Sequence, residues 1–125
     1  MPLLLKNCNI FAPEPLGVKD ILIEGERIAL IASDLDARNP AFKTEVIDFG
    51  GATVTPGLID IHVHATGGGG EQGPTSRVPE LMLTDFTLNG VTSIVGLLGT
   101  DGVSRSLENL LYKVRALEEE GMTSS

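Results

Sequence analysis

The alternation of hydrophobic and polar positions in the first fifty residues predicts short β-strands. Runs rich in Val, Ile and Leu cover residues 3–11, 21–24, 27–32 and 45–49. Gly25 and Glu26 join the second run to the third, and a glycine beside a polar residue between such runs is a hairpin signal. We therefore expect an antiparallel β unit over residues 1–55.

Beyond Pro56 the pattern changes to strands that alternate with helices. Apolar strands are expected at 58–63 and 91–98, helices at 78–89 and 107–117, and the start of a third strand at 122–125. Ser104 or Ser106 can cap the second helix. This order is typical of the beginning of a parallel α/β array, of which about two β/α units are present. A closed barrel takes eight such units.

The charge balance narrows the classes of partner. The formal net charge is −8 and the sequence pI is about 4.6, whereas nucleic acid and anionic membrane surfaces attract basic proteins. No run approaches the ~18 apolar residues of a membrane span. Cys8 is the single cysteine, so no internal disulfide can form. We expect no nucleic acid partner, no membrane partner and a cytoplasmic location.

The strongest chemical signal lies in the strand that follows Pro56 and Gly57. Because side chains alternate between the two faces of a strand, Asp60, His62 and His64 are expected on one face. The apolar set, residues 59, 61 and 63, is expected to pack beneath a helix. The polar set would lie near the carboxyl end of the strand, where barrel enzymes place their sites.

Two histidines separated by one residue on a strand lie about 6 to 7 Å apart at Cα and can converge on one metal ion. Imidazole suits zinc, although nickel, cobalt and iron stay possible. The alternative is a pair of surface or hydrogen-bonded histidines on an edge strand. His62 and His64 are the only histidines of the chain, and we predict both as metal ligands. Asp60 is expected behind them, where a hydrogen-bonded carboxylate fixes the geometry of such a site.

The segment 65–75 is a glycine-rich loop that contains one carboxylate, Glu71. Glycines let the backbone approach a ligand closely, and a carboxylate there can pair with a substrate ammonium group. The alternative is a flexible loop that binds nothing. Thr100 follows the next strand and can supply a hydroxyl to the same site, or serve in a turn with Asp101.

Three further charged residues are interpreted as solvent-exposed or helix-end charges. They are Arg77, Asp85 and Arg105.

The Pro-Gly-x-x-Asp-x-His-x-His frame of residues 56–64 resembles the first-strand motif of the amidohydrolase superfamily. Three later segments are similar to the isoaspartyl dipeptidases of that superfamily: Gly-Gly-Gly-Gly-Glu-Gln-Gly-Pro-Thr at 67–75, Gly-Val-Thr-Ser at 90–93, and Val-Gly-Leu-Leu-Gly-Thr-Asp at 95–101. The resemblance covers nearly the whole chain and is weaker before Val46.

The resemblance implies hydrolysis of β-aspartyl dipeptides at a two-zinc site in a (β/α)8 TIM barrel. Residues 1–55 would be the amino-terminal part of a composite β-sandwich domain, and residues 56–125 the first β/α units of the barrel. His62 and His64 would bind the more buried metal, whereas Gly69, Glu71 and Thr100 would bind substrate. The family also implies a homo-oligomer.

The same resemblance places a bridging lysine, two further histidine ligands and a catalytic aspartate beyond residue 125. We therefore expect no catalytic residue within residues 1–125 and no activity of these residues alone. Two alternatives stay open. One is another amidohydrolase that acts on cyclic amides, of the dihydroorotase or hydantoinase type. The other is a non-catalytic interaction fragment.

Overall fold

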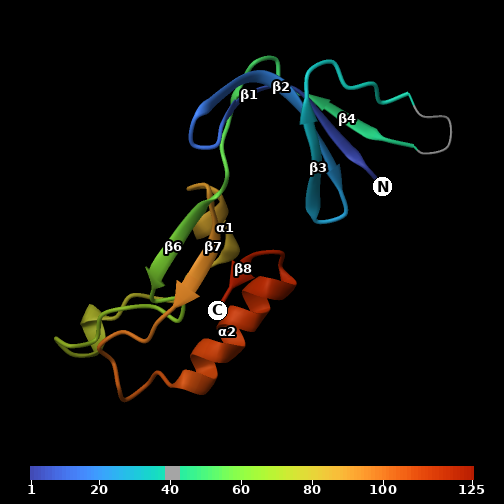
Figure 1. Cartoon of the computed structure of the whole chain (residues 1–125). Coiled ribbons are helices and arrows are strands. Elements are labelled where there is room, and N and C mark those ends of the chain that lie inside the picture. Colours follow the sequence, from blue (N-terminus) through green and yellow to red (C-terminus); the bar gives the residue numbers. More distant parts are fainter. Residues whose placement is uncertain (39–42) are drawn as a thin grey trace. The chain divides into compact units, whose positions relative to one another are not determined.

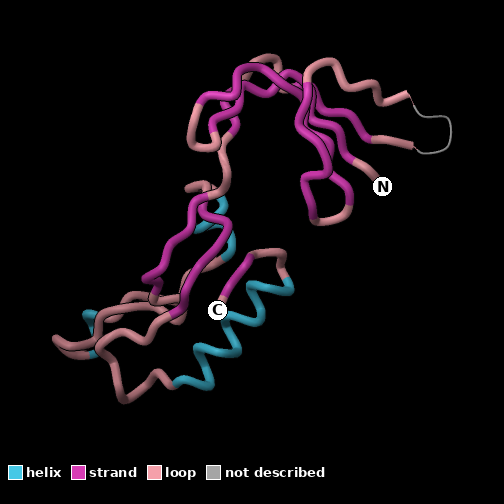
Figure 2. Tube along the Cα trace, in the orientation of Figure 1, coloured by secondary structure: helices cyan, strands magenta, loops and turns pink. Residues whose placement is uncertain are grey.

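The computed structural model describes residues 1–38 and 43–125, and the chain divides into two compact units, Met1–Pro56 and Gly57–Ser125 (Figure 1). The division falls one residue from the boundary expected from the sequence. Both units contain a sheet, and the helices belong to the second unit (Figure 2). The membership of the first unit in a composite β-sandwich stays a prediction.

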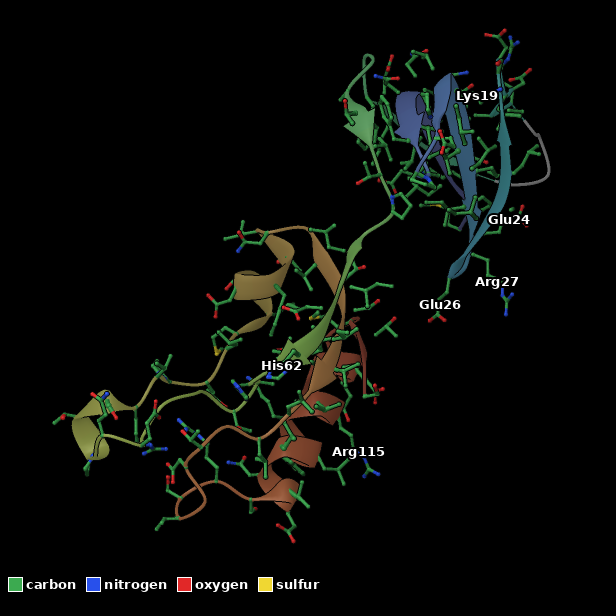
Figure 3. All side chains as sticks on the ribbon, turned by 60° about the vertical axis from the view of Figure 1, so that its left-hand side comes forward. Lys19, Glu24, Glu26, Arg27, His62 and Arg115 are labelled. Carbon is green, nitrogen blue, oxygen red and sulfur yellow. The ribbon has the colours of Figure 1, made fainter. Side chains whose placement is uncertain are left out.

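The first unit is a mixed sheet built around its first strand. Its strands are β1 (Leu3–Phe11), β2 (Pro15–Glu24), β3 (Arg27–Ala32), β4 (Glu45–Asp48) and β5 (Thr53–Val54). The order is β3-β2-β1-β4, and β5 also pairs with β1. The hairpin between β2 and β3 forms as predicted, and Glu26 and Arg27 project outward from its turn (Figure 3).

The expectation of a purely antiparallel unit is wrong. β1 pairs with β2, and β2 with β3, in antiparallel fashion, but β4 and β5 run parallel to β1. A tight turn can only reverse a strand, whereas the connection from β3 to β4 is longer than a hairpin turn. It lets β4 pair with the remaining edge of β1 in the same direction as that strand.

A buried carboxylate lies in the middle of β2, opposite the register shift in β1 between Leu5 and Cys8. The Asp20 side chain is 4% exposed and accepts hydrogen bonds from Lys6 Nζ at 2.6 Å and from the backbone N–H groups of Asn7 and Leu35, both at 2.9 Å. These donors, the Lys6 ammonium foremost, hold the pKa of Asp20 below its ordinary value despite burial. Nearby, Cys8, Ile10 and other apolar side chains form a small core, and Cys8 is buried as a free thiol.

The second unit begins a parallel α/β array, as predicted. Its elements are β6 (Leu58–Val63), η1 (Pro74–Ser76), α1 (Leu83–Thr87), β7 (Val91–Gly96), α2 (Leu107–Glu119) and β8 (Thr123–Ser124). The sheet order is β6-β7-β8, with all pairs parallel. Ser106 is the N-cap of α2, and its hydroxyl accepts from the backbone N–H of Asn109 at 3.3 Å.

The core of this unit lies between the sheet and its helices. Apolar side chains of β6, β7, α1 and α2 meet there, including Val63, Ile94, Phe86 and Leu117. Gly96 sits directly under α2, because a Cβ at this position would lie 2.9 Å from a methyl group of Val114. A glycine at the end of β7 thus allows α2 to approach the strand closely.

The predicted helix over 78–89 is wrong in its first half, because α1 covers only Leu83–Thr87. The N–H of Val78 donates to the carbonyl of Gly68 at 2.8 Å, and that of Leu81 donates to the carbonyl of Ala65 at 3.1 Å. Pro79 also disfavours the helical conformation at the residue before it. The preceding segment therefore pairs with the glycine-rich loop, and the interpretation of Asp85 as a helix-end charge is confirmed by its bond from the N–H of Met82.

None of the helices within the described residues has the length and hydropathy that crossing a membrane requires.

Replacing Asp20 by asparagine should destabilise the first unit at neutral pH. The change removes a buried charge acceptor, and hydrogen bonds to charged groups contribute about 1.5–3 kcal/mol each. Since the folded state lowers the pKa of Asp20, its contribution is present above the ordinary pKa of 3.8 and is lost as the pH falls through the folded value. Urea unfolding should show a deficit of about 2 kcal/mol at pH 7 that shrinks at pH 3. Asp36→Asn, in an exposed pair with Arg38, is the control. Equal deficits at both pH values would contradict the assignment.

Candidate functional site

The parallel pairing of β6 and β7 brings the carboxyl ends of both strands to one edge of the sheet. His64 follows β6 directly, and the glycine-rich loop follows His64. Beyond the end of β7, the N–H of Leu97 still donates to the carbonyl of Val63 at 2.7 Å. The loop after β7 therefore starts beside the histidines, and the two loops share one edge (Figure 1).

The two histidines lie close enough to share a ligand. Their ring centroids are 5.3 Å apart and their planes are nearly perpendicular, at 87°. His64 Nδ1 lies 3.2 Å from the carbonyl oxygen of Leu97, a position that calls for a protonated Nδ1. In that tautomer the lone pair of Nε2 is available to a metal ion. His62 lies near the end of β6, next to the loops (Figure 3).

An open cavity of about 440 Å³ borders this end of β6, and Asp60, His62 and His64 all line it. Asp60 Oδ1 also accepts from the backbone N–H of His62 at 3.0 Å, so the carboxylate braces the backbone of the predicted ligand. The expectation that the apolar set of β6 packs beneath a helix holds for Val63 alone. Ile59 and Ile61 are 70% and 72% exposed.

The glycine-rich loop is tightly packed. Gly67 and Gly69 have φ values of +93° and +66°, and a Cβ on either would lie 2.2 Å from a backbone carbonyl of the returning segment, that of Val78 or of Ser76 respectively. Glycine is required at both positions, since L residues rarely adopt these dihedrals and no space exists for a side chain. This packing, together with the paired backbone of residues 68 and 78, argues against a freely flexible loop.

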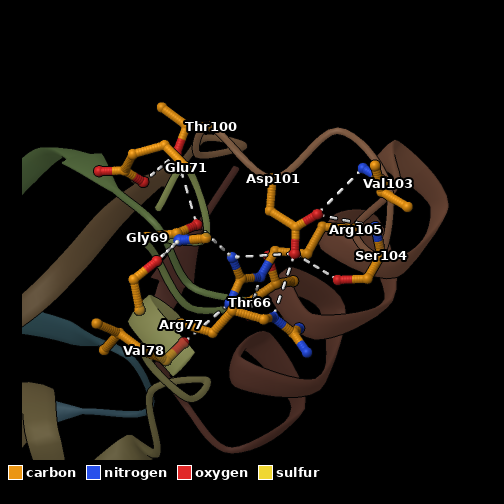
Figure 4. A network of polar contacts seen from close by, with 12 residues as sticks. Thr66, Gly69, Glu71, Arg77, Val78, Thr100, Asp101, Val103, Ser104 and Arg105 are labelled. Carbon is orange, nitrogen blue, oxygen red and sulfur yellow. Dashed lines mark hydrogen bonds and ion pairs between the residues drawn. The ribbon is translucent and has the colours of Figure 1, made fainter. Parts of the chain in front are cut away.

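Arg105 is buried and contacts the backbone of this loop. Its interpretation as a solvent-exposed or helix-end charge is wrong. The side chain is 2% exposed. Its guanidinium donates to three backbone carbonyls: to that of Thr66 from Nε at 3.0 Å, to that of Gly69 from Nη1 at 3.2 Å, and to that of Val78 from Nη2 at 2.9 Å (Figure 4). No local sequence pattern predicts that this arginine is buried, because the three carbonyls that it contacts lie 27 to 39 residues away in the sequence.

The structure brings together the three residues predicted to bind substrate. The hydroxyl of Thr100 donates to Glu71 Oε2 at 2.7 Å and lies 3.5 Å from the carbonyl oxygen of Gly69 (Figure 4). The Thr100 hydroxyl therefore contacts the other loop, while the Thr100 carbonyl accepts from the N–H of Gly102 at 3.1 Å in a turn around Asp101, so the turn of the alternative interpretation is also present. The hydrogen bond from Thr100 keeps the pKa of Glu71 below its ordinary value. At neutral pH Glu71 is thus an exposed anion held in a defined place.

Asp101 fixes the loop that carries Thr100. Its carboxylate accepts from the backbone N–H groups of Val103 and Ser104, at 3.1 and 2.9 Å, and from the Ser104 hydroxyl. These bonds lower the pKa of Asp101 to about 2. Arg77, which is 45% exposed, pairs with the same carboxylate at 3.2 Å. Arg77 thus behaves as the expected solvent-exposed charge.

Comparison with curated proteins and solved structures relates this arrangement to known hydrolases. No protein-family model matches the chain. A dihydroorotase from Streptococcus pyogenes serotype M3 is 33% identical over 111 residues, which are 86% of this chain and 24% of that protein. A D-hydantoinase from a Thermus species is 31% identical with a TM-score of 0.62, covering 91% of this chain and 24% of that one. The chain belongs to the amidohydrolase superfamily of hydrolytic enzymes, and its fold is that of the amino-terminal part of their barrel proteins.

Within this superfamily the chain is similar to β-aspartyl dipeptidase. The enzyme from Fervidobacterium islandicum AW-1 is 44% identical, with a TM-score of 0.92, over 99% of this chain and 34% of that chain. A second structure of that enzyme, in complex with a β-Asp-Leu dipeptide, gives the same identity and TM-score. The chain thus spans about a third of the length of this relative and about a quarter of the length of the dihydroorotases.

Replacing Thr100 by valine should raise the pKa of the Glu71 carboxyl towards its ordinary value. Valine keeps the branched shape but cannot donate the 2.7 Å hydrogen bond that stabilises the ionised form. The measurement is an NMR titration of the Glu71 side-chain carboxyl. Thr100→Ser, which retains the hydroxyl, should leave the titration close to that of the unmodified chain. An unchanged Glu71 pKa in Thr100→Val would show that the hydrogen bond does not form in solution.

Proposed function

We propose that this chain supplies two zinc ligands and the amino-group-binding loop of a β-aspartyl dipeptidase. The observation that carries the proposal is the contact between Glu71, Gly69 and Thr100, at the same sheet edge as the histidine pair. A β-aspartyl dipeptide has a free α-ammonium group beside the bond to be hydrolysed. An exposed carboxylate with a lowered pKa is a suitable acceptor for that group.

The donor chemistry of the histidine pair fits zinc. His62 and His64 offer two imidazoles from one strand, and the carbonyl of Leu97 orients one of them. Bound zinc would polarise the scissile carbonyl and make a nucleophile available near neutral pH. The residues of this chain would hold the metal through the two rings, keep the His62 backbone in place through Asp60, and bind the substrate ammonium at Glu71.

The chain by itself offers an incomplete set of ligands. In residues 1–38 and 43–125 no group of three or more His, Cys, Asp or Glu side chains is arranged to hold a metal ion. Catalytic zinc sites use three protein ligands. We therefore expect no turnover by the 125 residues alone, and the proposal concerns the complete product of the gene. We also propose that this complete product is cytoplasmic and forms a homo-oligomer.

A second candidate function is hydrolysis of a cyclic amide, which the similarity to dihydroorotases favours. Cyclic amides such as dihydroorotate lack a free ammonium group. Glu71 would then have no cationic partner in the substrate, and the hydrogen-bonded pair that it forms with Thr100 would have no evident use. A non-catalytic role for the chain is the third possibility, and it requires no metal at the histidines.

The complete gene product should hydrolyse β-Asp-Leu and should be far slower on dihydroorotate and hydantoin. Glu71→Gln should raise the KM for β-Asp-Leu about tenfold, since one charge-assisted pair is lost, with little change in kcat. Glu80→Gln, at an exposed carboxylate that pairs with Lys113, is the matched control and should leave both constants unchanged. The assay is release of free leucine. Faster turnover of dihydroorotate than of β-Asp-Leu would reject the dipeptidase proposal in favour of the second candidate.

Substituting the histidines tests the metal separately from the substrate. His62→Asn and His64→Asn should each lower the zinc bound per molecule of the complete product, because each removes one of the nitrogen ligands. Elemental analysis after dialysis is the measurement. Cys8→Ser, in the other unit and buried, should retain the zinc. Full zinc content in both histidine variants would exclude these residues as ligands.

A further inference from the structure

A buried guanidinium beneath the glycine-rich loop is the feature that the proposed chemistry does not yet use. Burying an unpaired charge is costly, so a buried arginine persists only where its donors are satisfied. All three nitrogen atoms of Arg105 donate to backbone carbonyls of the loop and its returning segment. None of these carbonyls belongs to a helix or a strand. The loop thus takes from one side chain the partners that secondary structure would otherwise supply.

The three carbonyls lie on both arms of the loop. Thr66 and Gly69 belong to the arm that leaves β6, and Val78 belongs to the arm that returns towards α1. Arg105 therefore joins the arms at their base (Figure 4). Consecutive glycines have unusually wide conformational freedom, so a loop of this composition loses much entropy when it is ordered. The guanidinium offsets part of that cost.

The contact reaches the predicted substrate residues through Gly69. The carbonyl of Gly69 accepts from Arg105 Nη1 and lies within 3.5 Å of the Thr100 hydroxyl, which in turn donates to Glu71. Asp101 lies 3.8 Å from Arg105 Nη1 and balances part of its charge. Thr100 and Arg105 thus hold the glycine-rich loop from one segment, the loop after β7.

We propose that Arg105 is the positioning residue that presents Gly69 and Glu71 to the substrate ammonium group. The identity of the substrate in this inference rests on the proposed function. The ordering of the glycine-rich loop by Arg105 does not depend on it. Three donors in a rigid plane match three carbonyls, whereas a lysine ammonium is a compact point charge that cannot span them. Charge alone would therefore not replace the guanidinium.

Hydrogen exchange tests the structural part without any activity. In the complete gene product, Arg105→Lys and Arg105→Gln should accelerate exchange at the amides of Val78 and Leu81, which donate to the loop, by about tenfold or more. The amides of the β6–β7 ladder should keep their protection. Arg77→Lys is the matched control, because it makes the same substitution at an arginine whose side chain is 45% exposed. Unchanged exchange at Val78 and Leu81 in both Arg105 variants would overturn the proposal, as would equal acceleration throughout the second unit.

Kinetics test the link to the substrate. Arg105→Lys should raise the KM for β-Asp-Leu about tenfold while kcat changes little, as for loss of one charge-assisted contact. In the Glu71→Gln background the same change should cost less than about twofold, because residues that act through one another are not additive. If the effects of Arg105→Lys and Glu71→Gln on KM simply multiply in the double variant, Arg105 does not act through Glu71. If the unmodified protein does not hydrolyse β-Asp-Leu, the proposed function fails, and the exchange experiment still decides the role of Arg105.

Discussion

The parallel pairing of β6 with β7 is the constraint on which the site depends. Parallel strands end at the same edge, so the residues after β6 and those after β7 must share one surface whatever their separation in sequence. The histidines lie there at the end of β6, and Thr100 lies there in the loop after β7. The hydrogen bond from Leu97 to Val63 continues the ladder past the end of β7. It also places the Leu97 carbonyl where it can orient His64.

The loops at this edge need further hydrogen-bond partners, because a loop lacks the regular pairing that satisfies the backbone N–H and C=O groups of helices and strands. The glycine-rich loop has two sources of partners. The first is the segment that the sequence suggested as helix, which instead donates backbone hydrogen bonds to the loop from Val78 and Leu81. The second is Arg105, which binds carbonyls on both arms. Backbone pairing and a buried guanidinium together convert a run of glycines into a fixed platform for Glu71.

The elements that were predicted correctly are those whose signal is local. The strands at 3–11, 27–32 and 58–63 follow runs of apolar residues bounded by turns, and the capped helix over 107–119 follows a 3.6-residue stripe. Local motifs and family resemblance also singled out the His-x-His pair and Gly69, Glu71 and Thr100, which the structure places close together, while their roles toward metal and substrate stay predictions. Errors arose where distant partners decided the outcome. The pairing of β4 with β1, the non-helical backbone at 78–81 and the burial of Arg105 all depend on contacts far apart in sequence.

The charges of the site have a consequence for its behaviour with pH. Glu71 and Asp101 both have lowered pKa values, the latter about 2, because hydroxyl and backbone donors stabilise their ionised forms. A carboxylate with a lowered folded pKa contributes stability above its ordinary value and loses it only as the pH falls through the folded value. Both anions therefore persist from neutral pH down to the ordinary carboxyl range, and Asp101 persists well below it. Across that range the loop keeps its geometry and its negative charge. A change in binding near neutral pH would therefore have to arise from groups other than these two carboxylates.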